Sequence, residues 1–407
     1  MGDYLPLLSA LVALLAGLAI GKAWERYKLQ DGRWIDRRRA RESPHYMLGL
    51  NFVVGGQIDP AIDELTRAAE TAGDALEIRL TLGNLYREKG QVGRAIQEHQ
   101  QLLQRPDLRK LEHANVLLCL GLDYKRGGFV DRALEAFNEV LRLDPENPYA
   151  LSNLEKLYEE QHQWTDAYAT RQRLASQDAK TQGTRHEEIL AFLENELGLE
   201  ALRRGETQDA LRRFQAAIEL DARNTPAYLN LGDLHLQHGD VAAAIDAWER
   251  LVAQSPERAY LAFSRLEDAY EKAATPGRFP ELCRQLIAAS PQDWRARLAL
   301  GRHLGATGDP SQALEMMFDA LVQNPHALVL HQSIWQTLSQ LGLARPLVAR
   351  YVDLTRDAVF YLDAHICIRC RYRSTELLWQ CPHCHEWNAF VEERIAPAKD
   401  SEATLSR

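Results

Sequence analysis

The chain has 407 residues, a formal net charge of −9, 46% hydrophobic residues and 26% charged residues. This length is too great for one compact core, so we expect two or more structural units. The composition excludes a wholly disordered chain, and the net charge argues against a general nucleic-acid binder, because phosphate binding needs a basic surface.

The N-terminal segment is predicted to be a membrane anchor. Residues 4–21 carry no charged side chain, and as a helix they would be about 27 Å long, close to the thickness of a bilayer core. A cleaved secretory signal is the alternative, but such a signal begins with basic residues. The only charged side chain ahead of the apolar run is Asp3. We therefore expect a single transmembrane anchor over residues 1–22.

The basic residues follow the apolar run, within a predicted juxtamembrane linker of residues 23–41 and at its edge. They are Lys22, Arg26, Lys28, Arg33, Arg37, Arg38, Arg39 and Arg41. Because positive charge stays on the cytoplasmic side, the N-terminus should face out and the bulk of the chain should lie in the cytoplasm. Trp24 and Tyr27 fit as interfacial anchors, and the arginines could also contact anionic headgroups.

A short sequence phrase recurs along the central part of the chain, with a period near 34 residues. The phrase is a Leu-Gly pair, and an alanine stands twelve residues after each glycine. The glycines are Gly49, Gly83, Gly121, Gly198, Gly232 and Gly301, and the alanines are Ala61, Ala95, Ala133, Ala210, Ala244 and Ala313. This pattern predicts helical hairpins, with glycine where two helices cross closely and alanine at the tightest contact. Phe137, Phe214 and Trp248 are expected to fill the gap between units, and Gly-containing turns should join the two helices.

The pattern resembles the tetratricopeptide repeat. The resemblance implies a mostly α fold, a tetratricopeptide-repeat superhelix of about eight repeats over residues 42–345. Extra polar residues at 176–185 predict a joint between two sub-arrays, with a longer helix turn as the alternative. The concave wall of such a stack, lined by first helices, suits an extended peptide or a partner's helix. Asn84, Arg87, Lys125 and Arg126 are predicted to be partner-binding residues on this wall, although an ordinary solvated face is the alternative.

Four of the six cysteines predict a metal site near the C-terminus. They form two CxxC pairs, Cys367 with Cys370 and Cys381 with Cys384, and such pairs supply four thiolates to zinc or iron. The predicted ribbon covers residues 360–394, too few to bury a core unless the metal contributes folding energy. The two remaining cysteines, Cys119 and Cys283, are expected to be ordinary core residues.

The sequence is compatible with several alternatives for the ribbon. An electron-transfer iron centre and a disulfide pair are alternatives to a structural metal site, and His365, His383 or His385 could replace a thiolate. Residues 377–379 are expected to form a strand, and Trp387 and Phe390 are expected to pack around the cluster. The segment is similar to the rubredoxin-type metal ribbon, with Arg371 where that ribbon has glycine. Residues 395–407 are predicted to be disordered.

The order of anchor, basic residues, repeats and the CIRC…CPHC tail resembles the lipopolysaccharide assembly protein B family over essentially the full length. The resemblance implies an adaptor of the inner membrane that works with the membrane AAA+ protease FtsH. Its client would be the deacetylase of the lipid A pathway, and other lipopolysaccharide assembly proteins would be partners. In that family the four ribbon cysteines bind the metal.

An enzymatic role is not expected, because the sequence has no nucleophile elbow, no phosphate-binding glycine loop and no HExxH motif. A general scaffold for envelope biosynthesis enzymes and a rubredoxin-type electron-transfer protein are the alternative functions.

Overall fold

The computed structural model describes residues 43–71, 75–177, 185–355 and 365–393. The predicted anchor and linker, the centre of the predicted joint and the predicted disordered tail lie outside the described residues. The described part is mostly helical, with 18 α-helices, one 3-10 helix and three short strands. None of the helices in these four ranges is long and apolar enough to cross a membrane.

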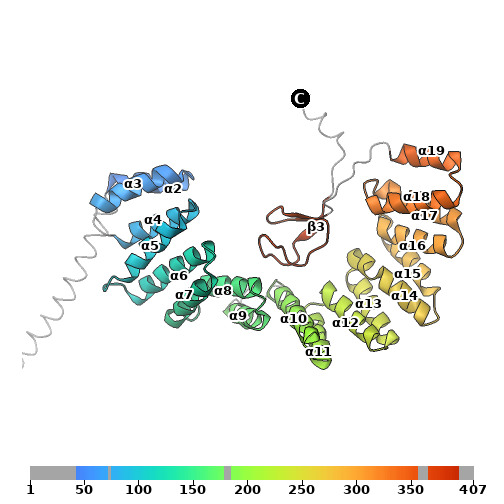
Figure 1. Ribbon diagram of the computed structural model, residues 1–407, viewed down its shortest axis with the longest axis horizontal. Coiled ribbons are helices and arrows are strands. Elements are labelled where there is room, and N and C mark those ends of the chain that lie inside the picture. The colour runs from blue at the N-terminus through green and yellow to red at the C-terminus, as the bar shows by residue number, and fades with distance from the viewer. Residues whose placement is uncertain (1–42, 72–74, 178–184, 356–364, 394–407) are drawn as a thin grey trace, which may run out of the picture. The chain divides into compact units, whose positions relative to one another are not determined.

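Figure 1 labels helices α2 to α19, which follow one another along the chain, and strand β3 of the small sheet at the C-terminal end. The helices are α2 (Pro44–Val54), α3 (Ile58–Thr71), α4 (Leu76–Glu88), α5 (Val92–Leu103), α6 (Lys110–Arg126), α7 (Val130–Leu143), α8 (Pro148–Glu160), α9 (Trp164–Gln177), α10 (Arg185–Arg203), α11 (Thr207–Leu220), α12 (Thr225–Gln237), α13 (Val241–Gln254), η1 (Pro256–Leu261), α14 (Phe263–Lys272), α15 (Arg278–Ala289), α16 (Trp294–Ala306), α17 (Pro310–Gln323), α18 (Leu328–Gln340) and α19 (Arg345–Leu354). The strands are β1 (His365–Cys367), β2 (Arg373–Ser374) and β3 (Phe390–Glu392).

The chain forms two compact units, Met1–Leu157 and Tyr158–Arg407, so the boundary falls inside α8. The sequence favoured a joint at residues 176–185, and the boundary lies upstream of it. The reason is that the end of α8, together with α9 and α10, packs with the C-terminal ribbon, as described below, and these helices therefore belong to the second unit.

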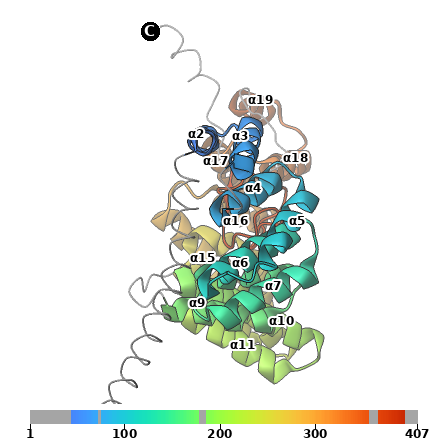
Figure 2. The same cartoon turned by 90° about the vertical axis from the view of Figure 1, so that its left-hand side faces the viewer.

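In the hairpins that carry the Leu-Gly pair, the glycine of the first helix lies directly against one large side chain of the second helix. A Cβ atom added to Gly121 would lie 2.6 Å from the ring of Phe137. The same atom on Gly232 would lie 2.2 Å from the ring nitrogen of Trp248. Since real Cβ atoms do not approach so closely, glycine is required there for the two helices to touch, which confirms the predicted role of the Leu-Gly pair. Figure 2 shows one such hairpin, α6 with α7.

The turns between paired helices also follow the prediction. Gly128, Gly205 and Gly239 have φ of +75°, +78° and +80°, a left-handed conformation that costs glycine little. Each turn reverses the chain, so that the alanines of the second helices, such as Ala133 and Ala210, are fully buried.

The isolated cysteines differ from each other. Cys283 is fully buried, and burial raises the pKa of its thiol to about 12, as expected of a core residue. Cys119 is only half-buried. Burial is also the main cause that raises its pKa, although Arg87 opposes the shift.

The ribbon contains a three-stranded antiparallel sheet in the order β2-β1-β3. The prediction of a strand at residues 377–379 was wrong, because β2 is Arg373–Ser374 and the chain then follows an irregular path. The physical reason is that neighbouring side chains there serve different cores. Leu377 and Leu378 pack beside the cysteines of the ribbon, whereas Trp379 packs against a helix of the repeats.

Candidate metal centre and its contact surface

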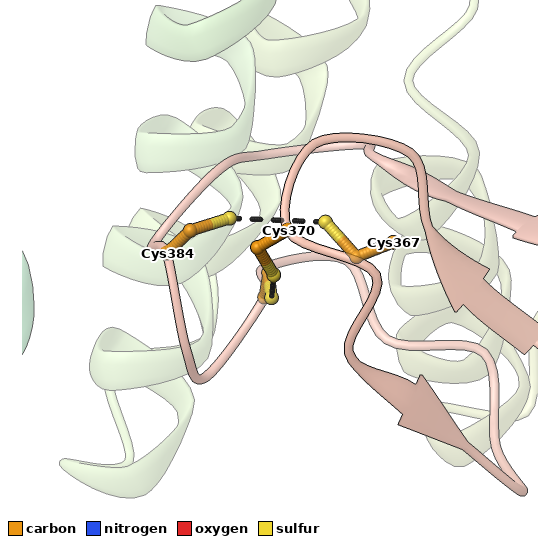
Figure 3. Close-up of side chains that lie close together, drawn as sticks. Cys367, Cys370 and Cys384 are labelled. Atoms are coloured by element: carbon orange, nitrogen blue, oxygen red, sulfur yellow. Dashed lines mark hydrogen bonds between the residues drawn. The ribbon is translucent and has the colours of Figure 1, made fainter. Parts of the chain in front are cut away.

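The four predicted cysteines converge on one point, and their sulfur atoms all lie within 4.8 Å of one another. Figure 3 shows the close approach of Cys367 and Cys384, whose Sγ atoms are 3.7 Å apart, and the Sγ atoms of Cys370 and Cys381 are 3.5 Å apart. A tetrahedral ion with metal–sulfur bonds of about 2.3 Å requires sulfur–sulfur distances of roughly 3.8 Å. The donor set therefore fits one zinc or iron ion held by four thiolates.

Each CxxC pair is shaped by a short turn of the backbone. The N–H of Arg371 donates to the carbonyl of Cys367, and the N–H of His385 donates to the carbonyl of Cys381, both at 2.9 Å. Arg371 and His385 have φ of +64° and +53°, in the left-handed region that favours glycine. The rubredoxin-type ribbon has glycine at the first of these positions, so this chain accepts backbone strain to keep a side chain there.

The turns also favour ionisation of one ligand. Burial opposes a charge on Cys367, but backbone N–H groups of Cys370 and Arg369 point at its sulfur, and the pKa of Cys367 is lowered to about 7. A thiolate is the form that binds a metal. The turn therefore favours the metal-binding form of Cys367.

The three histidines of the ribbon are directed elsewhere. His385 lies 3.6 Å from the carboxylate of Glu160 in α8, and the ring of His383 stacks on Tyr372. His365 is in β1, and burial followed by the charge of Arg295 lowers its pKa. None of them belongs to the cluster of four sulfur atoms among the described residues. Four thiolates complete a tetrahedral site, which leaves no open position of the kind that a catalytic zinc needs.

The ribbon packs against the repeats of the second unit through Trp387. This ring, predicted to cover the cysteines, instead stacks on Phe192 of α10, with ring centroids 5.3 Å apart, and meets Trp164 of α9 edge-on at 6.4 Å. Trp387 is only 4% exposed. Phe390 behaves as predicted and packs beside Cys367 and Cys381. Trp387 packs outside the ribbon because a ribbon of this size has room for only a few large rings in its own core.

A buried carboxylate at the end of α8 holds both ends of the second CxxC turn. The indole N–H of Trp387 donates to one oxygen of Glu159 at 3.0 Å, and the amide of Gln380 donates to the other oxygen at 2.9 Å. Gln380 and Trp387 also pair with each other as an isolated β-bridge that closes the turn around Cys381 and Cys384. Glu159 is 3% exposed, so it accepts these bonds away from bulk water.

Charged contacts surround this centre. Glu386 accepts bonds from Arg185 of α10 and from Arg369 of the first CxxC turn. Burial would raise the pKa of Glu386, but the two arginines overcome it and lower that pKa. Glu392 of β3 pairs with Arg295 of α16. The ribbon is therefore fixed to several repeats, and most of the contacts come from first helices.

Sequence reasoning found the four ligands but missed this contact surface. Gln380 and Trp387 are 221 and 228 residues from Glu159 along the chain, and no local spacing connects them. The one available signal was the pair Glu159 and Glu160 at the end of a first helix, in a position where a partner's donor groups could reach them.

The residues predicted to bind partners all lie in the first unit, on α4 and α6. The guanidinium of Arg87 donates to Asp123 at 2.8 Å and to Asn84 at 2.8 Å, so it links successive first helices. Asp123 is fully buried, and its other oxygen lies 2.5 Å from Nδ1 of His99. Arg126 is exposed and Lys125 is half-buried. Arg87 thus contributes to the packing of the repeats, and partner binding by these four residues stays a prediction.

Comparison with known proteins agrees with both parts of the chain. A tetratricopeptide repeat model matches residues 46–107, 119–179 and 195–259, and a rubredoxin metal binding domain model matches residues 365–392. Lipopolysaccharide assembly protein B of Escherichia coli (strain K12) is 24% identical over 382 residues, which cover 93% of this chain and 96% of that protein. The protein of the same name from Haemophilus influenzae is 25% identical over 408 residues, covering 96% of this chain and 99% of that one. A solved tetratricopeptide repeat protein from Parabacteroides merdae matches with a TM-score of 0.35 and 17% identity, over 74% of this chain and 99% of that chain.

Proposed function

Because the chain belongs to the lipopolysaccharide assembly protein B family, we propose that it is a non-enzymatic adaptor of the inner membrane that restrains lipopolysaccharide synthesis. In this proposal it brings the deacetylase of the lipid A pathway to the membrane protease FtsH for degradation. The proposed anchor, residues 1–22, confines the adaptor to the plane of the protease and so raises its effective concentration there. The proposed partner-binding wall is formed by first helices of the repeats.

The observation that carries the proposal is that the metal ribbon has a closed metal site and packs against the repeats. Four thiolates close the site, and the ribbon is fixed to the repeats through Trp387 and Glu159. A metal in this position stabilises a protein surface and has no open position for a substrate. This supports an adaptor in which the metal is needed for the shape of the second unit.

The test is made in cells that produce the full chain. The variant Cys381→Ser with Cys384→Ser removes two ligands and should release the ribbon, and the deacetylase should then accumulate. The matched control is Cys119→Ser, which changes a cysteine outside the metal site and should leave the deacetylase level low. Immunoblotting of the deacetylase with active and with inactive FtsH measures both effects.

A deacetylase level that stays flat when the whole chain is depleted would contradict the proteolytic role. That result would favour the alternative, a general scaffold that assembles lipopolysaccharide biosynthesis enzymes. Reversible reduction of an iron-loaded chain by a redox partner would instead favour electron transfer.

A further inference from the structure

One leucine of the recurring Leu-Gly pair is exposed where its equivalents are buried. In the later repeats this position is 3% exposed at Leu82, 5% at Leu120 and 4% at Leu231, whereas Leu48 is 43% exposed. Elsewhere the preceding repeat covers the leucine. Among the described residues α2 is the first helix, so nothing described there covers Leu48.

The exposed leucine belongs to an uncharged stripe along α2. Met47, Leu48, Asn51 and Val54 lie on one side of the helix, because residues spaced by three or four share a face. Met47 is 53% exposed and Val54 is 90% exposed. The titratable side chains of α2 are His45 and Tyr46, and Nδ1 of His45 lies 2.6 Å from Glu64 of α3.

Such a stripe is unusual at the end of a repeat stack, where a polar outer face normally keeps the protein soluble. At the position of Val54 the later repeats carry exposed polar or charged residues such as Glu88, Arg126 and Arg203. We therefore expect the apolar stripe on α2 to be covered by another molecule or by a membrane.

The size of the stripe argues against a second copy of the chain as its cover. An 11-residue helix presents a face of roughly 16 Å by 10 Å, far below the roughly 800 Å² that each partner contributes to a typical stable interface. A helix of this size can instead lie in the boundary between lipid headgroups and acyl chains, with its apolar side inward.

The charge of the residues that precede α2 also favours a membrane surface as its cover. Residues 33–42 contain five arginines, one aspartate and one glutamate, which gives a net charge of +3, and only Ser43 separates them from α2. Basic residues of this density are attracted to anionic lipids. Acidic side chains, which the membrane would repel, are absent from α2.

We propose that α2 lies flat on an anionic membrane surface, with Met47, Leu48 and Val54 in the headgroup boundary. This inference rests on the proposed membrane anchor and extends it. The first unit would be held at a defined height and orientation at the bilayer, and would not be free at the end of a flexible tether.

The test uses the full chain in vesicles that contain phosphatidylglycerol. A photoreactive diazirine amino acid replaces Val54, and the matched control replaces Leu111 of α6, which is 68% exposed in the same unit. Irradiation should give chain–lipid adducts at position 54, about tenfold above those at position 111, because only α2 is embedded. A crosslinked dimer, an adduct confined within one chain, or equal lipid labelling at both positions would overturn the proposal.

A second variant separates this inference from the anchor. Val54→Glu should remove the lipid adducts formed by a diazirine residue at position 47, whereas Val54→Leu should keep them. Val54 is 90% exposed, so neither change disturbs the core of the repeat. Loss of the whole chain from membranes after alkaline extraction would show that the anchor itself is wrong, whereas a retained chain with unchanged adducts in Val54→Glu would refute only the position of α2.

Discussion

Replacing Glu159 with alanine tests whether the repeats stabilise the metal site. The carboxylate accepts bonds from Trp387 and Gln380, the two residues that close the second CxxC turn. In Glu159→Ala the buried indole N–H of Trp387 would have lost this acceptor for as long as the ribbon stays docked, whereas the half-buried amide of Gln380 could turn to water. Each buried unsatisfied donor costs about 1–3 kcal/mol. Docking should therefore weaken by up to about 3 kcal/mol, which corresponds to at most roughly 150-fold in the docking equilibrium.

This loss should appear in the metal site itself, because docking and metal binding favour each other by the same coupling free energy. The measurement is the equilibrium partition of zinc between the full chain and a chelating dye. Glu159→Ala should weaken zinc binding by up to about 150-fold, and Glu159→Gln, which retains one acceptor oxygen, should give an intermediate affinity.

The adjacent residue provides the matched control. Glu160 carries the same charge on the same helix, but its side chain is 25% exposed and its partner His385 is 3.6 Å away. An ion pair of this kind contributes about 0–1 kcal/mol, so Glu160→Ala should bind zinc with close to the original affinity. Equal zinc affinities for Glu159→Ala and Glu160→Ala, with unchanged helical content, would refute the coupling.

Three further changes probe the repeats and the ribbon. Arg371→Gly should raise the stability of the ribbon by about 1 kcal/mol, because glycine accepts the left-handed φ without strain, and a higher denaturant midpoint for loss of the metal–thiolate absorption would show it. Gly121→Ala should lower the stability of the first unit by about 1–3 kcal/mol through its clash with Phe137, whereas Gly93→Ala, which meets no atom within 4 Å, should raise it slightly; denaturant unfolding measures both. Burial and the carboxylate of Glu249 raise the pKa of Tyr270 above 10.0, so the stability that this phenol contributes is present below pH 10 and falls as the pH rises further. Tyr270→Phe should therefore flatten the decrease in melting temperature above about pH 10.

The repeats could be predicted from the sequence because their contacts are local. Gly121 and Phe137 are 16 residues apart and touch within one hairpin, so the spacing of side-chain sizes records the packing directly. The CxxC turns are equally local, since backbone bonds within four residues aim both sulfur atoms of a pair. Wherever the partner of a residue lay within one hairpin or one turn, its role followed from its position.

The role of Trp387 could not be predicted in this way. An apolar ring next to a metal site has several possible covers, and apolar contact has no direction of its own. The position of Trp387 is determined by Phe192 together with the acceptor Glu159, and both belong to repeats that are remote in sequence. Arg87 illustrates the same limit, because the sequence placed it on the wall but gave no sign that the buried Asp123 would engage it.

The docked ribbon has a consequence for where a client can bind. Under the proposed function, a client that used the C-terminal end of α8 and the first-helix face of α10 would have to displace Trp387 from Phe192 and Glu159. Exposing the ring of Trp387 to water costs about 4 kcal/mol at roughly 25 cal/mol per Å², and the broken contacts of Glu386 with Arg185 add to this. A client on the first unit meets no such competitor among the described residues, and Lys125 and Arg126 of α6 are there. We therefore expect a client to bind the first unit, while the ribbon holds the second unit in shape.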